Sequence, residues 1–247
     1  MNFIRKIFGL DSKEPVNVKP RKNFSQIRVI EDLNPTLTDE DILPVLISSK
    51  TQEFYLDKEI AYLFHEREGS YAKVVMAHVL LDKNSINKNG ESELLHISTR
   101  NKDKEYYDML QEAGQRNFDN LEVPFEFWNP TDKNLEYKVL SCNMWFFASQ
   151  KILSKKHMLE AHKLLNADEL LVSIPRRELI FVCDKNVAKD HYAHFLNMHS
   201  YFVLHENEEL EFLCEDIFVV KNGEIYGVLE ITQLSEFLIK NNHQYKG

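Results

Sequence analysis

The stretch LLVSIPRRELIFVCD, residues 170–184, decides the fold of this chain. It contains two runs of apolar, β-branched and aromatic residues, which favour a pleated, half-buried strand. Between the runs stands Pro175, which has no amide hydrogen for a central ladder and therefore belongs at the end of a strand. The pattern predicts a strand, a turn from Pro175 to Glu178, and a second strand.

Two adjacent arginines, Arg176 and Arg177, lie in this predicted turn. Guanidinium groups bind carboxylate or phosphate through two parallel hydrogen bonds, so we expect these residues to hold an anionic group at the tip or rim of a sheet. Adjacent side chains on extended backbone point to opposite faces, so at most one of them enters a given pocket. The alternative is a solvated turn, in which they pair with acidic neighbours such as Asp168, Glu169 and Glu178.

Length and composition predict a folded, soluble protein. The chain has 247 residues, of which 43% are hydrophobic, enough for one large domain or two small ones. No apolar run approaches the roughly 20 residues that a membrane-spanning helix needs, and the first ten residues do not resemble a secretory signal. Cys142, Cys183 and Cys214 are too widely spaced for a CxxC metal pair. We therefore expect reduced, buried cysteines and a cytoplasmic location.

Charge is unevenly distributed along the chain. The net charge is -9, yet residues 1–28 carry seven basic and two acidic residues, a local charge of +5. The remainder has a charge of -14. Because nucleic-acid binding requires a basic surface, this acidic body argues against a nucleic-acid partner.

The first ten residues have a pattern of their own. Phe3, Ile4, Ile7 and Phe8 recur near helical spacing around two basic residues, which is typical of a short amphipathic helix that contacts a membrane surface. The alternative is a terminal helix that is frayed or docked on its own domain. Pro15 and Pro20 stand in the linker that follows.

Three segments repeat apolar residues at helical spacing: residues 102–117, 154–166 and 185–199. We expect Asn101 or Thr99 to cap the first of these helices. A helix-start signature at residues 38–41 predicts a further short helix over residues 42–47.

Strand patterns occupy much of the remaining sequence. Residues 72–81 fit either a strand or a helix. Near the end of the chain, β-rich runs over residues 210–220 and 225–231 flank Asn222-Gly223, the strongest short-range hairpin signal. The mixed order of elements predicts an α+β fold of mixed, largely antiparallel sheets with packed helices.

The chain divides by composition into three parts. Residues 1–23 are expected to form a flexible basic arm, residues 24–120 an N-terminal α+β lobe, and residues 134–247 a C-terminal α+β lobe. Residues 123–134 contain two prolines and indicate a connection between the lobes. The alternative is one continuous domain.

Catalytic motifs are weak in this sequence. Ser173 or Asp184 could serve a hydrolase together with His191 or His194, but no nucleophile-elbow motif surrounds either residue. The three histidines of one predicted helix, the third being His199, are expected to be solvated rather than metal ligands. With seven glycines and no glycine-rich loop before a helix, the chain is expected to bind no nucleotide cofactor.

Four segments together resemble the uncharacterised bacterial YtpQ-like family: ILPVL at residues 42–46, AGQRNF at residues 113–118, ASQKILS at residues 148–154, and residues 170–184. The closest similarity is at the Pro175 turn, where the family has a Val-Ala-x-Pro-x-Arg-Asp pattern. This chain departs from the family in Phe118, where leucine is usual, and in Ser173, where alanine is usual. The resemblance implies a soluble cytoplasmic α+β protein and implies no activity.

From these observations we expect a binding or accessory protein for a macromolecular partner or a small anionic ligand. Arg176, Arg177 and Trp145, the last in an aromatic cluster over residues 145–149, are the candidate ligand-binding residues. Two alternatives stay open, a hydrolase and a membrane-surface accessory protein that acts through residues 1–10.

Overall fold

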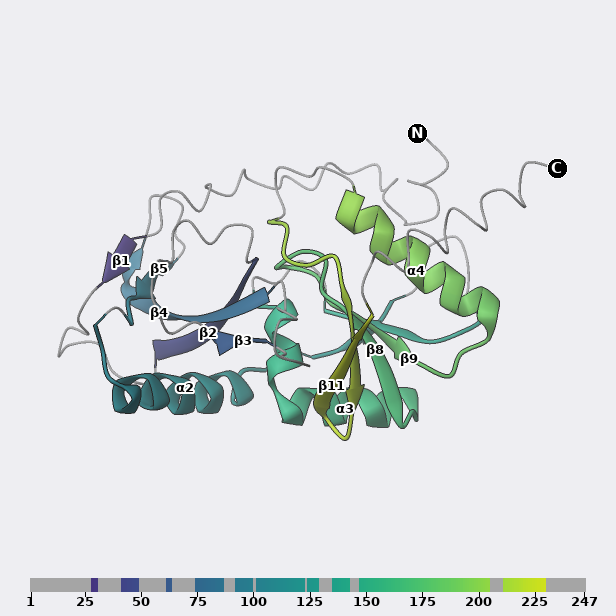
Figure 1. Cartoon of the computed structure of the whole chain (residues 1–247), viewed down its shortest axis with the longest axis horizontal. Coiled ribbons are helices and arrows are strands. Elements are labelled where there is room, and N and C mark those ends of the chain that lie inside the picture. Colours follow the sequence, from purple (N-terminus) through teal and green to yellow (C-terminus); the bar gives the residue numbers. More distant parts are fainter. Residues whose placement is uncertain are drawn as a thin grey trace.

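A computed structural model gives the fold in Figure 1. It describes residues 28–30, 41–48, 61–63, 74–86, 92–99, 101–122, 124–128, 135–142, 147–204 and 211–229. The expected amphipathic segment, the linker and Trp145 lie outside these ranges. Within them the chain forms two β-sheets with packed helices, which confirms the expected α+β class.

The stretch at residues 170–184 forms two neighbouring strands at the centre of the second sheet. The strands of this sheet are β6 (Glu126–Phe127), β7 (Val139–Ser141), β8 (Glu169–Ser173), β9 (Phe181–Asp184), β10 (Ile217–Lys221) and β11 (Glu224–Leu229). Their order is β11-β10-β8-β9-β7-β6, and every neighbouring pair is antiparallel. The predicted strand, turn and strand around Pro175 is therefore confirmed.

Helices cover both faces of the second sheet, with α3 (Lys155–Leu165) on one side and α4 (Lys189–Leu204) on the other (Figure 1). Along β8, Leu170 and Val172 pack in the cluster that contains the α3 residue Met158, whereas Leu171 packs in the cluster that contains Phe195 of α4. Because both faces are buried, successive residues 170–172 of β8 and 181–183 of β9 are apolar, which explains the continuous runs in the sequence.

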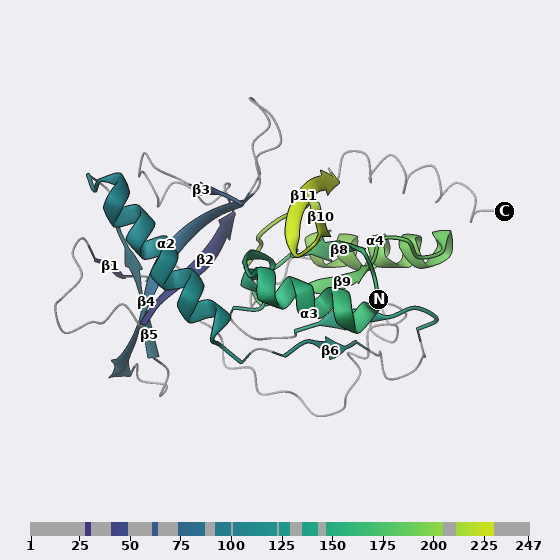
Figure 2. The same cartoon turned by 90° about the horizontal axis from the view of Figure 1, so that it is seen from below.

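The first sheet follows a different path. Its strands are β1 (Arg28–Ile30), β2 (Ile42–Ser48), β3 (Ala61–Tyr62), β4 (Val74–Ile86) and β5 (Ser92–Ile97). The order is β1-β5-β4-β2, and β3 also pairs with β4; only β1 and β5 are parallel. Helix α2 (Lys104–Asp119) covers one face of this sheet, as Figure 2 shows from below. Leu110 and Ala113 on α2 belong to one cluster with Leu80 of β4.

The predicted helix over residues 42–47 is wrong, because these residues form strand β2. Every residue of β2 is buried, and a short apolar run buried on both faces cannot be told from a buried helix by its periodicity. Pro44 is tolerated because β2 ends the path of the sheet and, within the described chain, pairs only with β4.

Helices α2 and α3 occupy the predicted segments. The cap of α2 is Asp103, whose side chain accepts a hydrogen bond from the Tyr106 amide at 2.9 Å, so the expectation of Asn101 or Thr99 is wrong. In α3, Ser154 caps the N-terminus, and Asn166 ends the helix in the left-handed region at φ 53°.

The end of α2, where the chain leaves the first sheet, is bonded to the N-terminus of α3. Ser154 Oγ donates a hydrogen bond to Asp119 Oδ1 at the end of α2, and Lys156 Nζ donates to the Asp119 carbonyl at 2.7 Å. A carboxylate at the N-terminus of α3 also interacts favourably with the helix dipole. The segment expected to be pure connection contains β6, which corrects that expectation for residues 126–127. The division into two lobes stays a prediction.

The Asn222-Gly223 hairpin is confirmed, although its first strand, β10, begins at Ile217, later than predicted. Both turn residues have positive φ, 52° for Asn222 and 78° for Gly223, as a two-residue primed turn requires. The Gly223 amide donates a hydrogen bond to His162 Nε2 at 3.3 Å, which joins the turn to α3.

Replacing Gly223 with alanine is expected to lower the free energy of unfolding by more than about 1 kcal/mol, since alanine is strained at positive φ. A Cβ there would also lie 3.0 Å from the Lys155 carbonyl oxygen. Urea denaturation would measure the change. The matched control is Gly227→Ala on β11, where a Cβ would come no closer than 3.8 Å to Val219. Equal stability of the two variants would contradict the prediction.

Candidate functional site

The turn after β8 folds into the protein. Arg176 is 6% exposed and Arg177 is 1% exposed, so the alternative of a solvated turn is wrong. The physical reason is a second segment that pairs with the turn. Arg176 forms an antiparallel bridge with Phe212, the Arg177 amide donates to the Glu211 carbonyl at 3.0 Å, and the Leu213 amide donates to the Pro175 carbonyl at 3.0 Å.

The Arg176 side chain binds the end of α4. Its Nε donates to the Phe202 carbonyl at 2.8 Å and its Nη2 to the Val203 carbonyl at 3.4 Å. The last carbonyls of a helix have no partners within the helix, so this guanidinium acts as a C-terminal cap. The guanidinium also lies 5.6 Å from the centre of the Phe212 ring. These contacts give Arg176 a structural role.

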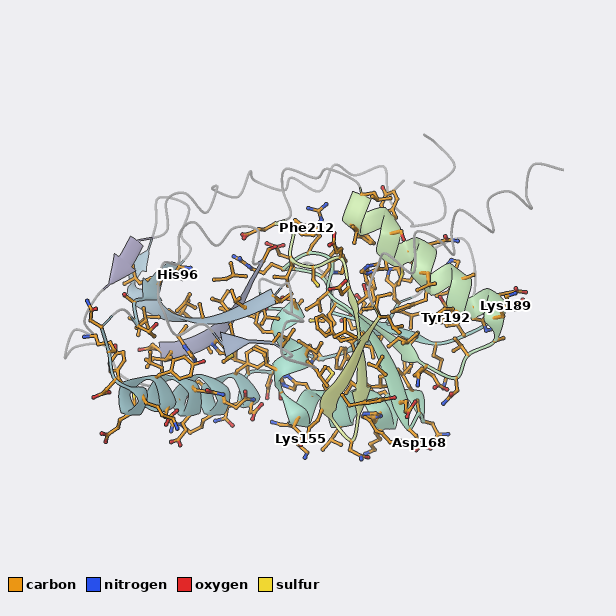
Figure 3. The ribbon with its side chains drawn as sticks, in the orientation of Figure 1. His96, Lys155, Asp168, Lys189, Tyr192 and Phe212 are labelled. Carbon is orange, nitrogen blue, oxygen red and sulfur yellow. The ribbon has the colours of Figure 1, made fainter. Side chains whose placement is uncertain are left out.

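The Arg177 side chain takes a separate direction. Its Nη2 forms an ion pair of 2.7 Å with Glu211 Oε1. Its positive charge also contributes, after burial, to lowering the pKa of His96 on β5 to about 3. Arg177 therefore places its charge near the first sheet, whereas Arg176 reaches α4. The prediction that only one of the two arginines enters a given site is consistent with these contacts. Figure 3 shows Phe212 between the strand of His96 and helix α4.

Glu211 is the more accessible partner of this pair. Its side chain is 21% exposed, against 1% for Arg177. Its second oxygen, Oε2, is buried, and within the described chain no hydrogen-bond donor meets it. Burial raises the pKa of Glu211, and the nearby Glu178 carboxylate acts in the same direction, against the opposing charge of Arg177. The carboxylate is thus held by one oxygen in an environment that disfavours its charge.

Of the aromatic cluster, the structure describes only residues 147–149, and all three are buried. Phe147 packs in the hydrophobic cluster of the first sheet. A core role therefore applies to Phe147, and the ligand-binding role of Trp145 stays a prediction.

The hydrolase alternative expected Ser173 to meet His191 or His194, but Ser173 meets His199 instead. Ser173 Oγ donates to His199 Nδ1 at 2.8 Å, because His199 Nε2 carries the proton that it donates to the Glu215 carbonyl at 2.9 Å. Both side chains are fully buried, so no substrate reaches this serine in the structure described. The expectation that His199 is solvated is also wrong.

The other residues of the hydrolase alternative have separate contacts. His194 Nδ1 and the Tyr137 hydroxyl are 2.8 Å apart, and His191 Nε2 lies 3.2 Å from Glu136 Oε2. Asp184 accepts a hydrogen bond from the Asn186 amide at 2.9 Å. None of these three contacts joins a nucleophile to a base.

Metal binding has no support in the parts of the chain that are described. Among those residues, no group of three or more His, Cys, Asp or Glu side chains could hold a metal ion. Cys142, Cys183 and Cys214 are free and buried, as expected. None of the helices within the described ranges has the length and apolar character needed to cross a bilayer.

Sequence analysis did not single out Lys151, whose side chain is fully buried. Its ammonium lies 3.9 Å from the centre of the Phe125 ring. Burial lowers the pKa of Lys151 to about 8, against the opposing charge of Glu160. The sequence does not indicate that this lysine is buried. Its burial results from the packing of residues 149–153 against their neighbours.

Lys151→Met is expected to raise the free energy of unfolding by about 1–3 kcal/mol at pH 7, because the desolvation of the buried ammonium that it removes outweighs the cation–π contact with Phe125 and the attraction of Glu160. The folded pKa is lowered, so the penalty is complete below about pH 8 and disappears as the pH rises toward 10.5. Urea denaturation at pH 7 and pH 10 would measure the gain. The control is Lys163→Met, an exposed lysine on α3. A gain that is the same at both pH values would contradict the explanation.

The chain was compared with known proteins by sequence and by structure. No family model matches it, no curated protein matches it, and no solved structure matches it. The resemblance to the YtpQ-like family therefore stays a prediction. The contacts and burial of the residues described above are the observations that bear on function.

Proposed function

We propose that this protein is a cytoplasmic binding protein for a small anionic ligand and that Arg177 is the charged contact for that ligand. One observation carries the proposal: a guanidinium that is almost completely buried pairs with a partly exposed carboxylate. Guanidinium groups that recognise anions in proteins commonly use two hydrogen bonds, and burial strengthens such bonds. The free, buried cysteines fit a reducing compartment.

The contacts of Arg176 separate it from this role, because its Nε and Nη2 bond to the carbonyls at the end of α4. These contacts favour Arg177 over Arg176 as the ligand contact. Arg177 also lies where both sheets contribute side chains, since its charge acts on His96 of the first sheet. Ligand sites commonly form where two layers of a fold meet.

The test is a thermal-shift screen with small carboxylates, inorganic phosphate and nucleotides, followed by calorimetry of any ligand that raises the melting temperature. The variant is Arg177→Met/Glu211→Leu, which removes both charges of the pair so that neither is left buried alone. Lys163→Met is the control for loss of one exposed cation. Binding by the wild type and the control, lost in the double variant, is expected. Binding that survives in the double variant, or no binding of any anion, would overturn the proposal.

A further inference from the structure

The Glu211 carboxylate binds Arg177 in the way that the carboxylate of a ligand would. It contacts Arg177 through Oε1 alone, at 2.7 Å, and its buried Oε2 meets no hydrogen-bond donor among the described residues. A free carboxylate that approached the same guanidinium could orient both of its oxygens, because no backbone tether restricts it. The intramolecular pair is therefore geometrically poorer than the pair that a ligand could form.

The backbone of Glu211 is fixed separately from its side chain. The Glu211 carbonyl accepts the Arg177 amide at 3.0 Å, and the next residue, Phe212, bridges to Arg176. The side chain can consequently turn away from Arg177 without breaking the pairing of the two segments. Since the side chain is 21% exposed, it can turn toward solvent, and rotamer changes of this kind are fast.

We infer that Glu211 occupies the site in the absence of ligand and that the ligand is a carboxylate, which binds Arg177 by displacing the Glu211 side chain. This inference rests on the proposed function. A singly charged carboxylate is favoured over a phosphate dianion because Glu178 lies close enough to act on the charge of Glu211. A second negative charge would be repelled by the same carboxylate.

Displacement predicts a specific effect on affinity. The apparent dissociation constant equals the intrinsic one divided by the fraction of molecules in which Arg177 is released, so weakening the internal pair strengthens binding. Glu211→Gln keeps the shape of the side chain and removes its charge. We expect it to bind propionate, which has the size of a glutamate side chain, about ten- to a hundredfold more tightly than the wild type does.

The experiment is isothermal titration calorimetry of the full-length protein with propionate and with inorganic phosphate. Four proteins are compared: the wild type, Glu211→Gln, Glu211→Asp, and Glu136→Gln as a control for loss of an exposed carboxylate. Glu211→Asp keeps the charge but shortens its reach, so it should also bind propionate more tightly. This variant keeps the test decisive if the glutamine variant does not fold.

The outcomes separate the two proposals. Tighter propionate binding in both Glu211 variants, with no change in Glu136→Gln, is the expected result. Propionate binding of the same affinity in the wild type and in both Glu211 variants would overturn the displacement and leave the proposed function standing. Tighter binding of phosphate than of propionate would overturn the choice of a carboxylate. No binding of either anion to any of the four proteins would remove the proposed function and this inference together.

Discussion

Acidification from pH 7 to pH 5 is expected to unfold much of this protein, because its interior holds uncharged histidines. His78, His96 and His199 are each at most 3% exposed. Burial lowers the pKa of His78 and His199 to about 4, and burial together with the charge of Arg177 lowers the pKa of His96 to about 3. Histidine in an unfolded chain has a pKa of about 6.5. Between these values the unfolded chain binds more protons than the folded one.

The direction of the effect follows from this difference. The stability that depends on these histidines is complete above about pH 6.5 and is lost as the pH falls toward 4. Each histidine loses about 2 kcal/mol between pH 7 and pH 5, and three lose about 6 kcal/mol, which is comparable with the whole stability of many domains. His157, whose pKa burial also lowers to about 4, acts in the same direction. Glu211, whose pKa burial raises, offsets part of the loss.

Urea denaturation between pH 5 and pH 8 would measure this slope, and His78→Phe would isolate one histidine. The His78 ring packs edge-on against Tyr107, with 5.9 Å between the ring centres. In the described chain its buried Nε2 meets no hydrogen-bond partner, so phenylalanine removes a titrating group without breaking a bond there. The variant should take up about one proton fewer on unfolding. A slope that matches the wild type, or an equal change in the exposed control Met109→Leu, would contradict the assignment.

The parts of the fold that could be predicted from sequence are those with a local signal. The Pro175 turn and the Asn222-Gly223 hairpin each depend on a residue whose own backbone preference sets the structure. Strand β2 has no such signal, since burial on both faces removes the alternation that marks a strand. There the helix-start signature predicted a helix, but pairing with β4 stabilises a strand.

The candidate site could be predicted only in part. Sequence identified the arginines as a residue type that binds anions and placed their side chains on opposite faces. It could not identify Glu211, because that residue lies 34 positions from Arg177 and meets it only through pairing of two distant segments. The same holds for Ser173 and His199, which are 26 positions apart. Helical spacing favoured the wrong histidines, since it gives no information about which face of α4 meets β8.

Replacing Arg177 with methionine is expected to lower the free energy of unfolding by about 1–3 kcal/mol, since it leaves the Glu211 carboxylate without its charged partner. Glu211 Oε1 would lose the ion pair of 2.7 Å, although its side chain, 21% exposed, can turn toward solvent. The second variant, Arg177→Met/Glu211→Leu, removes both charges and should regain most of this loss, because buried ion pairs contribute little compared with apolar side chains of similar volume. Urea denaturation of the wild type, of Arg177→Met, of Glu211→Leu and of the double variant would complete a double-mutant cycle.

Arg176→Met gives the contrast that distinguishes the two arginines. It removes two hydrogen bonds to carbonyls at the end of α4 and should lower the free energy of unfolding by about 1–3 kcal/mol. Removing Glu211 as well should not restore that stability, because the two bonds of Arg176 are to the carbonyls of Phe202 and Val203. A double Arg177→Met/Glu211→Leu variant as unstable as Arg177→Met would contradict the ion-pair explanation. If the double variant is instead as stable as the wild type, folding does not require the pair, and ligand binding is the remaining reason for burying a guanidinium there.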